Sequence, residues 1–232
     1  MLKKYVLVLG SKPDSTLPNI KVEKIYTANG AAEKAQRYLD RFPETSFTAV
    51  VGGREFEVVE EVKKRVIKSM PDTLLSRSGP INFQRYDFTK KTNYQFFTFK
   101  QALLFQSQFF KLNVLDIFIK EFYYEEKFFN KIYHVLKKVK HGTLGGVSTG
   151  FFSILHALKF YPECDIIISG IGMSFGGHFY DTKNYKYNNR SKVDRALIVN
   201  LKKKYKDRLY TLDSELVKVA NIKQWDGNSF NL

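Results

Sequence analysis

The 232-residue sequence predicts an α/β protein built on one parallel, Rossmann-like β-sheet flanked by helices. Short apolar runs recur along the first and last thirds of the chain, and segments with a helical spacing of apolar residues separate them. The apolar runs are continuous rather than alternating, which is typical of parallel strands that helices cover on both faces. Ligands of such sheets gather at the carboxyl ends of the strands, so the loops that follow strands are the first places to search for a site.

The individual elements follow from these patterns in chain order. The predicted strands are Tyr5–Leu9, Lys24–Thr27, Phe47–Val51, Thr73–Ser76, Asp165–Ser169 and Leu209–Leu212. Two helical faces separate the first four strands: Ala31, Ala35, Tyr38, Leu39 and Phe42 share one, and Val58, Val59, Val62 and Val66 share the other. Ser148–Tyr161 is apolar on nearly all sides and is therefore predicted to be a buried helix, with His156 as a core residue. Val193–Tyr205 is predicted to be an amphipathic helix with Ser191 as its N-cap.

The middle of the chain differs from both ends because aromatic residues crowd it. Residues 83–133 hold nearly half of all the Phe, Tyr and Trp side chains. Residues 98–140 are expected to form two or three helices, and most of the rings are expected to pack in the core. A minority of them could form a platform on which a sugar stacks or an oligomer contact. Because no internal repeat or linker interrupts the pattern, residues 1–232 are expected to form a single domain.

The amino-acid composition limits the kinds of molecule that the protein is expected to bind. With 38 Lys and Arg against 23 Asp and Glu, the chain carries a formal charge of +15, which favours nucleic acid, anionic lipid or a phosphorylated or acidic-sugar substrate. Neither a zinc-finger spacing nor an aromatic RNA-binding strand motif supports nucleic acid. No apolar run reaches the roughly 18 residues of a membrane-spanning helix. The single cysteine, Cys164, excludes a disulfide framework and fits a reducing cytoplasm. We therefore expect a cytoplasmic protein whose basic surface could hold it at the inner face of the membrane.

Four loops carry candidate ligand-binding residues. They are Gly10-Ser11 after the first strand, Asn29-Gly30 after the second, Gly52–Glu55 after the third, and the run Ser148, Thr149, Gly150 that opens the most buried helix. Glycine lets the main chain approach a ligand, and a helix N-terminus with hydroxyl groups suits a phosphate. A tight turn or a helix cap explains the first three loops about as well. The fourth is neither a P-loop nor a GxGxxG fingerprint, because the lysine and the spacing are absent.

The stretch DIIISGIGMSFGGHFYD (165–181) combines a strand, four glycines, a histidine and a carboxylate. The strand ends at Ser169 and Gly170, and no helical pattern follows directly. Residues 172–192 are predicted to be a glycine-hinged lid that brings His178, Tyr180, Asp181 and Arg190 to the mouth of the sheet. One His and one Asp three residues apart fall short of a metal site, so no metal is expected. This prediction requires residues 148–150 to lie near residues 170–181 and to share a cavity with them.

Both ends of the chain resemble a known enzyme family. The stretches are VSTGFFSILHALKFYPECDIIISGIGMSF (147–175), RSKVDRALIVNLKKKYKDRLYTLDSELV (190–217), YVLVLGSKPDS (5–15) and YTANGAA (26–32). In this order they resemble segments of the bacterial CMP-sialic acid-dependent sialyltransferases of glycosyltransferase family 42, and more distantly of family 29. The resemblance covers about half of the chain and leaves out the aromatic middle.

The resemblance implies a single-domain, sialyltransferase-like variant of the GT-A fold. It also implies a CMP-activated donor, sialic acid or a related ulosonic acid such as Kdo, and no further cofactor. The nucleotide would lie against Gly10, Ser11, Asn29, Ser148, Thr149 and Gly150, with Ser169 and Gly170 below it. Two positions depart from the family pattern. Arg190 stands where the family has its catalytic histidine before Ser-Lys, and Gly172 stands where the family has an aspartate after Ser-Gly-Ile.

Such a reaction has two chemical requirements. The departing phosphate must be stabilised by preorganised donors, for which the start of the helix at Ser148, Tyr180 and Arg190 are candidates. The acceptor hydroxyl must lose a proton to a base, for which His178 is the first choice and Asp181 the second. Alternatively, Asp181 or Glu55 attacks as a nucleophile and forms a glycosyl-enzyme, which gives retention. Both schemes fit these residues.

The expected acceptor is a surface glycan or a lipid-linked saccharide, as in lipopolysaccharide or capsule synthesis. A second hypothesis is a non-catalytic basic α/β module that binds nucleic acid or an anionic membrane. It would show salt-sensitive binding to any polyanion and would tolerate the loss of His178 or Asp181. A nucleotide-dependent hydrolase or dehydrogenase of the Rossmann kind is disfavoured because its glycine fingerprint is missing.

Overall fold

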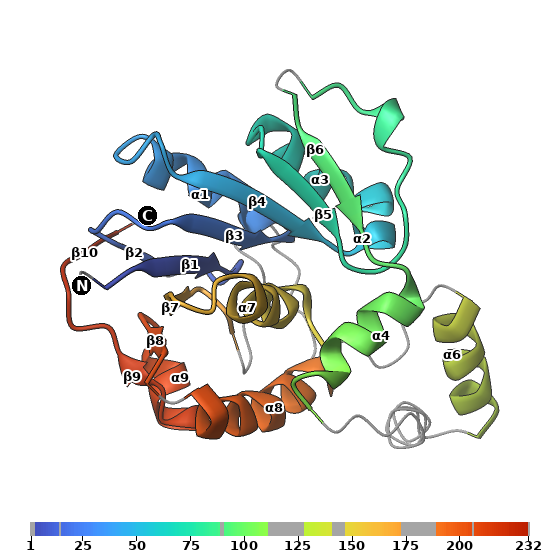
Figure 1. The fold of residues 1–232 in the computed structure, drawn as a ribbon. Coiled ribbons are helices and arrows are strands. Elements are labelled where there is room, and N and C mark those ends of the chain that lie inside the picture. The colour runs from blue at the N-terminus through green and yellow to red at the C-terminus, as the bar shows by residue number, and fades with distance from the viewer. Residues whose placement is uncertain are drawn as a thin grey trace.

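A central parallel sheet organises the protein, which we describe from a computed structural model over residues 3–13, 15–88, 91–110, 128–140, 147–172, 189–205 and 207–231. Its strands are β1 (Tyr5–Leu9), β3 (Lys24–Ala28), β4 (Ser46–Val51), β5 (Thr73–Ser76), β6 (Asn93–Phe96), β7 (Asp165–Ser169), β8 (Leu209–Thr211) and β9 (Lys223–Gln224). Within the described residues these eight strands are ordered β6-β5-β4-β3-β1-β7-β8-β9, and every neighbouring pair is parallel (Figure 1). The predicted fold class is confirmed.

Helices lie on both sides of this sheet. They are α1 (Ala32–Leu39), α2 (Gly53–Val58), α3 (Glu60–Lys68), α4 (Phe99–Ser107), α6 (Phe128–Lys140), α7 (Thr149–Phe160), α8 (Asn189–Tyr205) and α9 (Ser214–Ala220), with short 3₁₀ turns at Asn29–Ala31 and Phe83–Arg85. A separate antiparallel pair, β2 (Thr16–Pro18) and β10 (Ser229–Asn231), brings the two ends of the chain together (Figure 1). Among the described helices, none combines the length and the apolar composition needed to cross a bilayer.

Successive residues of the central strands are buried on opposite faces of the sheet. In β1, Val6 and Val8 belong to the core cluster that includes α7, and Leu7 and Leu9 belong to the cluster that includes α1 and α3. All four side chains are fully buried. This double burial is why the strands appear in the sequence as unbroken apolar runs.

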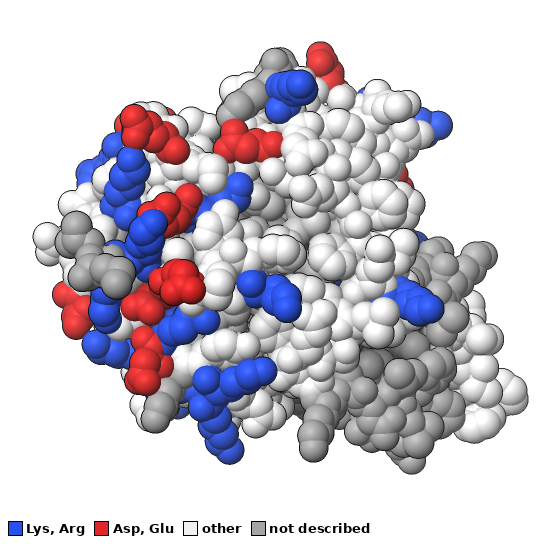
Figure 2. Space-filling model, viewed as in Figure 1, with Lys and Arg blue, Asp and Glu red and all other residues white. Residues whose placement is uncertain are grey.

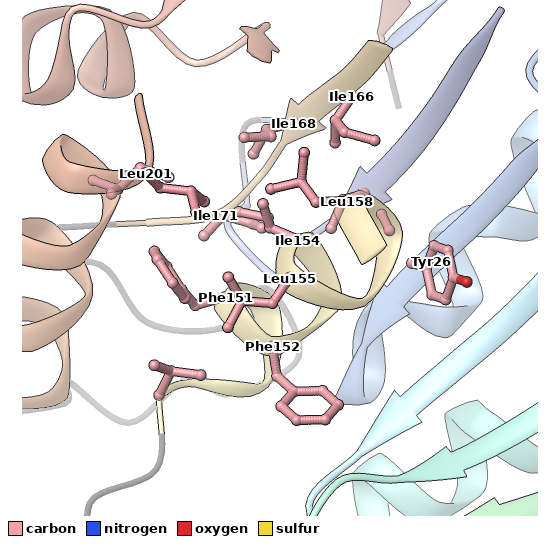
Figure 3. Packing of buried hydrophobic residues seen from close by; sticks show 14 of the residues in the cluster. Tyr26, Phe151, Phe152, Ile154, Leu155, Leu158, Ile166, Ile168, Ile171 and Leu201 are labelled. Carbon is pink, nitrogen blue, oxygen red and sulfur yellow. The ribbon is translucent and has the colours of Figure 1, made fainter. Parts of the chain in front are cut away.

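Helix α7 fills the middle of one face. Every residue from Thr149 to Leu158 is buried. Its apolar side chains pack against Ile166 and Ile168 of β7 and against Leu201 of α8 (Figure 3). Because α7 leads into a strand parallel to β1, it runs against the strand direction and its first turn lies at the carboxyl edge of the sheet. Packing on all sides therefore fixes the position of that first turn.

His156 lies inside this core, as predicted. Its Nδ1 is 3.1 Å from the hydroxyl of Tyr26, and the ring of Phe160 lies 4.3 Å away between centroids. Burial, and secondarily the charge of Lys24, lowers the pKa of His156 from 6.5 to about 4. The folded protein therefore holds this imidazole in its neutral form at neutral pH.

This burial makes stability depend on pH. The unfolded chain takes up a proton on His156 near pH 6.5, whereas the folded chain takes it up only near pH 4. The unfolded state thus binds more protons in this window, and the free energy of unfolding should fall as pH drops from 6.5 to 4, by roughly 3 kcal/mol. Urea unfolding at several pH values measures the slope. In the His156→Gln variant, the slope of the unfolding free energy against pH should fall by up to one proton per molecule. An unchanged slope would show that His156 is not the group responsible.

Four details of the sequence prediction were wrong. The expected helical face Val58–Val66 is split between α2 and α3, because Val59 has an extended backbone (φ −98°, ψ 97°). Val58, at the end of α2, is 66% exposed as a result. Strand β6 was not anticipated. Helix α8 begins at Asn189, so Ser191 lies within it rather than capping it, and β8 is followed by α9, β9 and β10 rather than ending the fold.

Candidate nucleotide-binding site

The order of the strands identifies where a ligand is expected. From β1 the chain proceeds outward through β3, β4, β5 and β6, and then returns to place β7, β8 and β9 on the other side of β1. The direction of progression therefore reverses between β1 and β7. In open parallel sheets, ligands bind outside the carboxyl ends of the strands at this switch point.

The loops that leave β1 and β7 are in main-chain contact at the switch point. The amide of Gly10 donates to the carbonyl of Ser169 (2.7 Å), and the amide of Lys12 donates to the carbonyl of Gly170 (2.9 Å). A Cβ on Gly10 would lie 2.1 Å from the Gly170 oxygen, and Gly170 has a φ of +70°. Glycine is thus required at both positions by the approach of one main chain to the other.

A buried aspartate holds the turn after β7. The Asp213 carboxylate accepts hydrogen bonds from the amides of Gly170 (3.1 Å) and Ile171 (3.3 Å). Burial raises the pKa of Asp213, and the hydrogen bond from Gly170 opposes that rise. This residue was missed by the sequence analysis. Its signal was modest, a single acidic residue directly after the last predicted strand.

The first turn of α7 lies directly beside this turn. A Cβ built on Gly150 would be 3.3 Å from the Ile171 side chain. Ser148 caps the helix, its Oγ accepting from the amide of Phe151 (3.1 Å), while its own amide donates to the buried Asp194 carboxylate (3.2 Å). Residues 148–150 thus lie beside the strand end at Gly170, whereas residues 173–181 of the same prediction lie outside the described residues.

Arg77 adds a permanent positive charge to this turn. It follows β5 and is only 6% exposed. Its Nε donates to Thr149 Oγ1 (2.9 Å), and its amide donates to the carbonyl of Val51 (2.9 Å). A helix N-terminus already favours negative charge, and a guanidinium presents donors in a geometry that suits phosphate. Both features favour negative charge at the start of α7, and the buried Asp194 carboxylate on the Ser148 amide already supplies part of it.

The sequence analysis also missed Arg77. It stands in the run SRSGP immediately after a predicted strand, which was the available signal. An arginine in a loop is usually a surface residue, and only the tertiary contact with Thr149 shows that this one is buried.

Asn29 and Gly52 connect the ends of β3 and β4. Asn29 has a φ of +51° and is buried, and its Oδ1 accepts from the amide of Gly52 (3.3 Å). Gly52 is the N-cap of α2, and the partly exposed Glu55 follows in the first turn of that helix. Asn29 therefore links the end of β3 to the end of β4, the strand next to the one that Arg77 follows.

The remaining predicted site residues fall into three groups. Ser11 lies in the loop after β1, next to Gly10. Ser169 is fully buried and its Oγ donates to the carbonyl of Thr16 (2.6 Å). His178, Tyr180 and Asp181 lie outside the described residues, and Arg190 lies in α8 with a side chain that is also outside them. Within the described part of the chain, no group of three or more His, Cys, Asp or Glu side chains is placed to hold a metal.

A second anion-attracting region lies at the opposite, amino edge of the sheet. A shallow cavity of about 490 Å³ is lined there by Lys3, Lys202, Asp207, Tyr210, Asn221 and Lys223. The Lys3 ammonium is 3.3 Å from the Tyr210 hydroxyl and 3.6 Å from the Asp165 carboxylate. This region competes with the start of α7 as a site for a phosphate-bearing ligand, and binding experiments must distinguish the two.

Comparison with known proteins gives little beyond this geometry. No protein-family model and no curated protein matches the sequence. A solved structure of the sialyltransferase CstII from Campylobacter jejuni, in complex with the substrate analogue CMP-3FNeuAc, is similar at a TM-score of 0.37 and 15% identity. The similarity covers 99% of this chain and 90% of that chain.

Proposed function

We propose that the protein is a glycosyltransferase that transfers sialic acid, or a related ulosonic acid such as Kdo, from its CMP ester to a glycan or lipid-linked saccharide. The observation that supports this most is the buried Arg77 guanidinium on Thr149, at the first turn of α7 and beside the β1–β7 switch point. It meets the need of the departing cytidylate for fixed donors. The Ser-Thr-Gly and Ser-Gly-Ile stretches that resemble family 42 lie at the same place.

In this proposal the charge that develops on the phosphate is stabilised by the first turn of α7 and by Arg77. Both are held rigidly, the helix by packing and the arginine by burial, so little reorganisation is needed as the bond to the sugar breaks. Tyr180 and Arg190 are further candidate donors. Gly10, Ser11, Asn29 and Gly52 would line the nucleotide side of the site, with Ser169 and Gly170 beneath it.

We propose two alternative mechanisms for the transfer, which differ in the residue that acts first. In the inverting form, His178 or Asp181 removes the proton of the acceptor hydroxyl. In the retaining form, a carboxylate attacks the sugar first, and Glu55 is the candidate within the described residues because α2 begins directly after β4. The anomeric configuration of the product distinguishes the two.

Addition of CMP should stabilise the protein against heat. A ligand that binds only the folded state raises the unfolding free energy by about 2.7 kcal/mol at a concentration of 100 Kd, which shifts the midpoint by several degrees in a chain of this size. We expect this shift with millimolar CMP and a smaller one with ATP or NAD. Stabilisation by ATP or NAD but not by CMP would contradict the proposal.

Incubation with CMP-sialic acid and with CMP-Kdo, each with a saccharide acceptor, tests the reaction itself. The proposal predicts release of CMP from one of the two donors at a rate well above spontaneous hydrolysis. Asp207→Asn, at the amino-edge cavity, should leave this rate unchanged. If the protein bound CMP but released no CMP from either CMP-sialic acid or CMP-Kdo, it would be a nucleotide-binding protein and the transferase proposal would be wrong.

A second candidate function is a non-catalytic module that binds polyanions. The charge of +15 and the three lysines at the amino-edge cavity favour it. It predicts binding that weakens steeply with salt and that is indifferent to His178→Ala and Asp181→Ala. A large loss of CMP-sugar turnover in these two variants, with an intact fold, would eliminate it.

A further inference from the structure

Helix α6 exposes an apolar stripe. The stripe consists of Phe128, Phe129, Ile132, Tyr133 and Leu136, all of them exposed. Their spacing places them on one side of a helix, whereas Val135 is buried. Phe129 is 83% exposed and Leu136 is 61% exposed, values that are unusual for large apolar side chains. Five of them on one 13-residue helix form a contiguous patch rather than scattered exceptions.

The charge of α6 is of one sign. Its sequence, FFNKIYHVLKKVK, contains Lys131, Lys137, Lys138 and Lys140 and no acidic residue. Aromatic and aliphatic residues on one face, combined with lysines, are typical of helices that lie in the interfacial plane of a membrane. Each lysine near an anionic surface contributes about 1 kcal/mol to binding.

The position of α6 suits such contact. It lies beside α4 at the periphery of the molecule, on the side toward which β1, β3 and β4 point (Figure 1). Most of the Lys, Arg, Asp and Glu side chains visible in Figure 2 gather on the opposite side, over the half that carries the chain ends. Helix α6 therefore lies at the edge of the molecule away from the chain ends (Figure 1).

We propose that α6 docks the protein on the surface of an anionic lipid bilayer, with its apolar stripe at the boundary between headgroups and acyl chains. A second copy of the chain suits the stripe less well. Its five side chains offer less than the about 800 Å² per partner of a stable interface. Docking is independent of the proposed chemistry, so either proposal can fail without the other.

Co-sedimentation of the full chain with lipid vesicles tests the proposal. The vesicles contain equal parts of phosphatidylglycerol and phosphatidylcholine, or phosphatidylcholine alone. The protein should bind the anionic vesicles, and the combined change Phe129→Ser, Tyr133→Ser, Leu136→Ser should lower its partition by about tenfold or more. Phe160→Ser is the matched control, since Phe160 is a 56% exposed aromatic at the far end of α7, and it should leave partition unchanged.

A spectroscopic readout locates the contact. Trp225 is the one tryptophan of the chain, so Trp225→Phe with Phe129→Trp gives a reporter on the stripe. Its emission should shift to shorter wavelength when anionic vesicles are added. Absence of vesicle binding, or binding that the triple change leaves intact, overturns the proposal. So does a wild-type dimer that the triple change converts to a monomer without any lipid effect, because the stripe would then be a contact between copies.

Discussion

Arg77→Gln is expected to lower the affinity for CMP and the turnover of the CMP-sugar by about 100-fold or more. Charge-assisted hydrogen bonds from a guanidinium to a phosphate are among the strongest single contacts that a protein makes, and they strengthen as charge develops in the transition state. The change removes the charge and keeps a planar donor beside Thr149. Calorimetry with CMP and initial rates of CMP release measure the two effects. Arg77→Lys should fall between, because a lysine keeps the charge and loses the fork of donors.

Arg208→Gln is the matched control for this prediction. Arg208 is also partly buried, and it donates to the carbonyls of Cys164 and Tyr161 (both 2.8 Å) at the amino edge of the sheet. Its replacement should lower stability without changing CMP affinity. Denaturant unfolding of both variants separates folding from binding. If the Arg77→Gln protein folded and bound CMP as tightly as the wild type, Arg77 would not be part of the binding site.

Gly10→Ala is expected to have the largest effect on stability, a loss of about 3 kcal/mol or more. The new Cβ would lie 2.1 Å from the carbonyl oxygen of Gly170 and 2.8 Å from the Cα of Ile171, and both are main-chain atoms that cannot turn aside. The β1 and β7 loops would have to separate. Since the Ile171 side chain contacts Gly150, the start of α7 would lose a neighbour as well. Urea unfolding measures the loss as a shift of the midpoint at constant m-value.

Gly172→Ala is the control, because a Cβ at Gly172 meets no atom of the described residues within 4 Å. It should change the unfolding free energy by less than about 0.5 kcal/mol. If Gly10→Ala and Gly172→Ala unfolded at the same urea concentration, the close approach of the two loops would not exist in solution.

The sequence predicted the sheet well because its signal is local. Continuous apolar runs identify β1, β3, β4, β5 and β7 to within a residue at either end. Strand β6 escaped because it pairs at the sheet edge and its Asn, Tyr, Gln and Phe side chains are largely exposed. The break between α2 and α3 at Val59 was not predicted, because the helical spacing of apolar residues continues through it.

The site itself stays a prediction, although part of its geometry follows from the sequence. Glycines and hydroxyls near strand ends pointed to the carboxyl edge of the sheet, and the structure brings Gly10, Gly170 and the Ser148–Gly150 turn together. Arg77 and Asp213 were missed because their burial depends on contacts between segments far apart in the chain, which no local pattern contains. The roles of His178, Tyr180 and Asp181 stay predictions.

Hydrogen–deuterium exchange with and without CMP tests the central claim most directly, namely that the first turn of α7 and the switch-point loops hold the nucleotide. CMP should slow amide exchange in residues 147–152 and 169–172 and in the loop that contains Arg77. Slowed exchange confined to the segments around Lys3, Lys202 and Lys223, or no change at millimolar CMP, would contradict the claim.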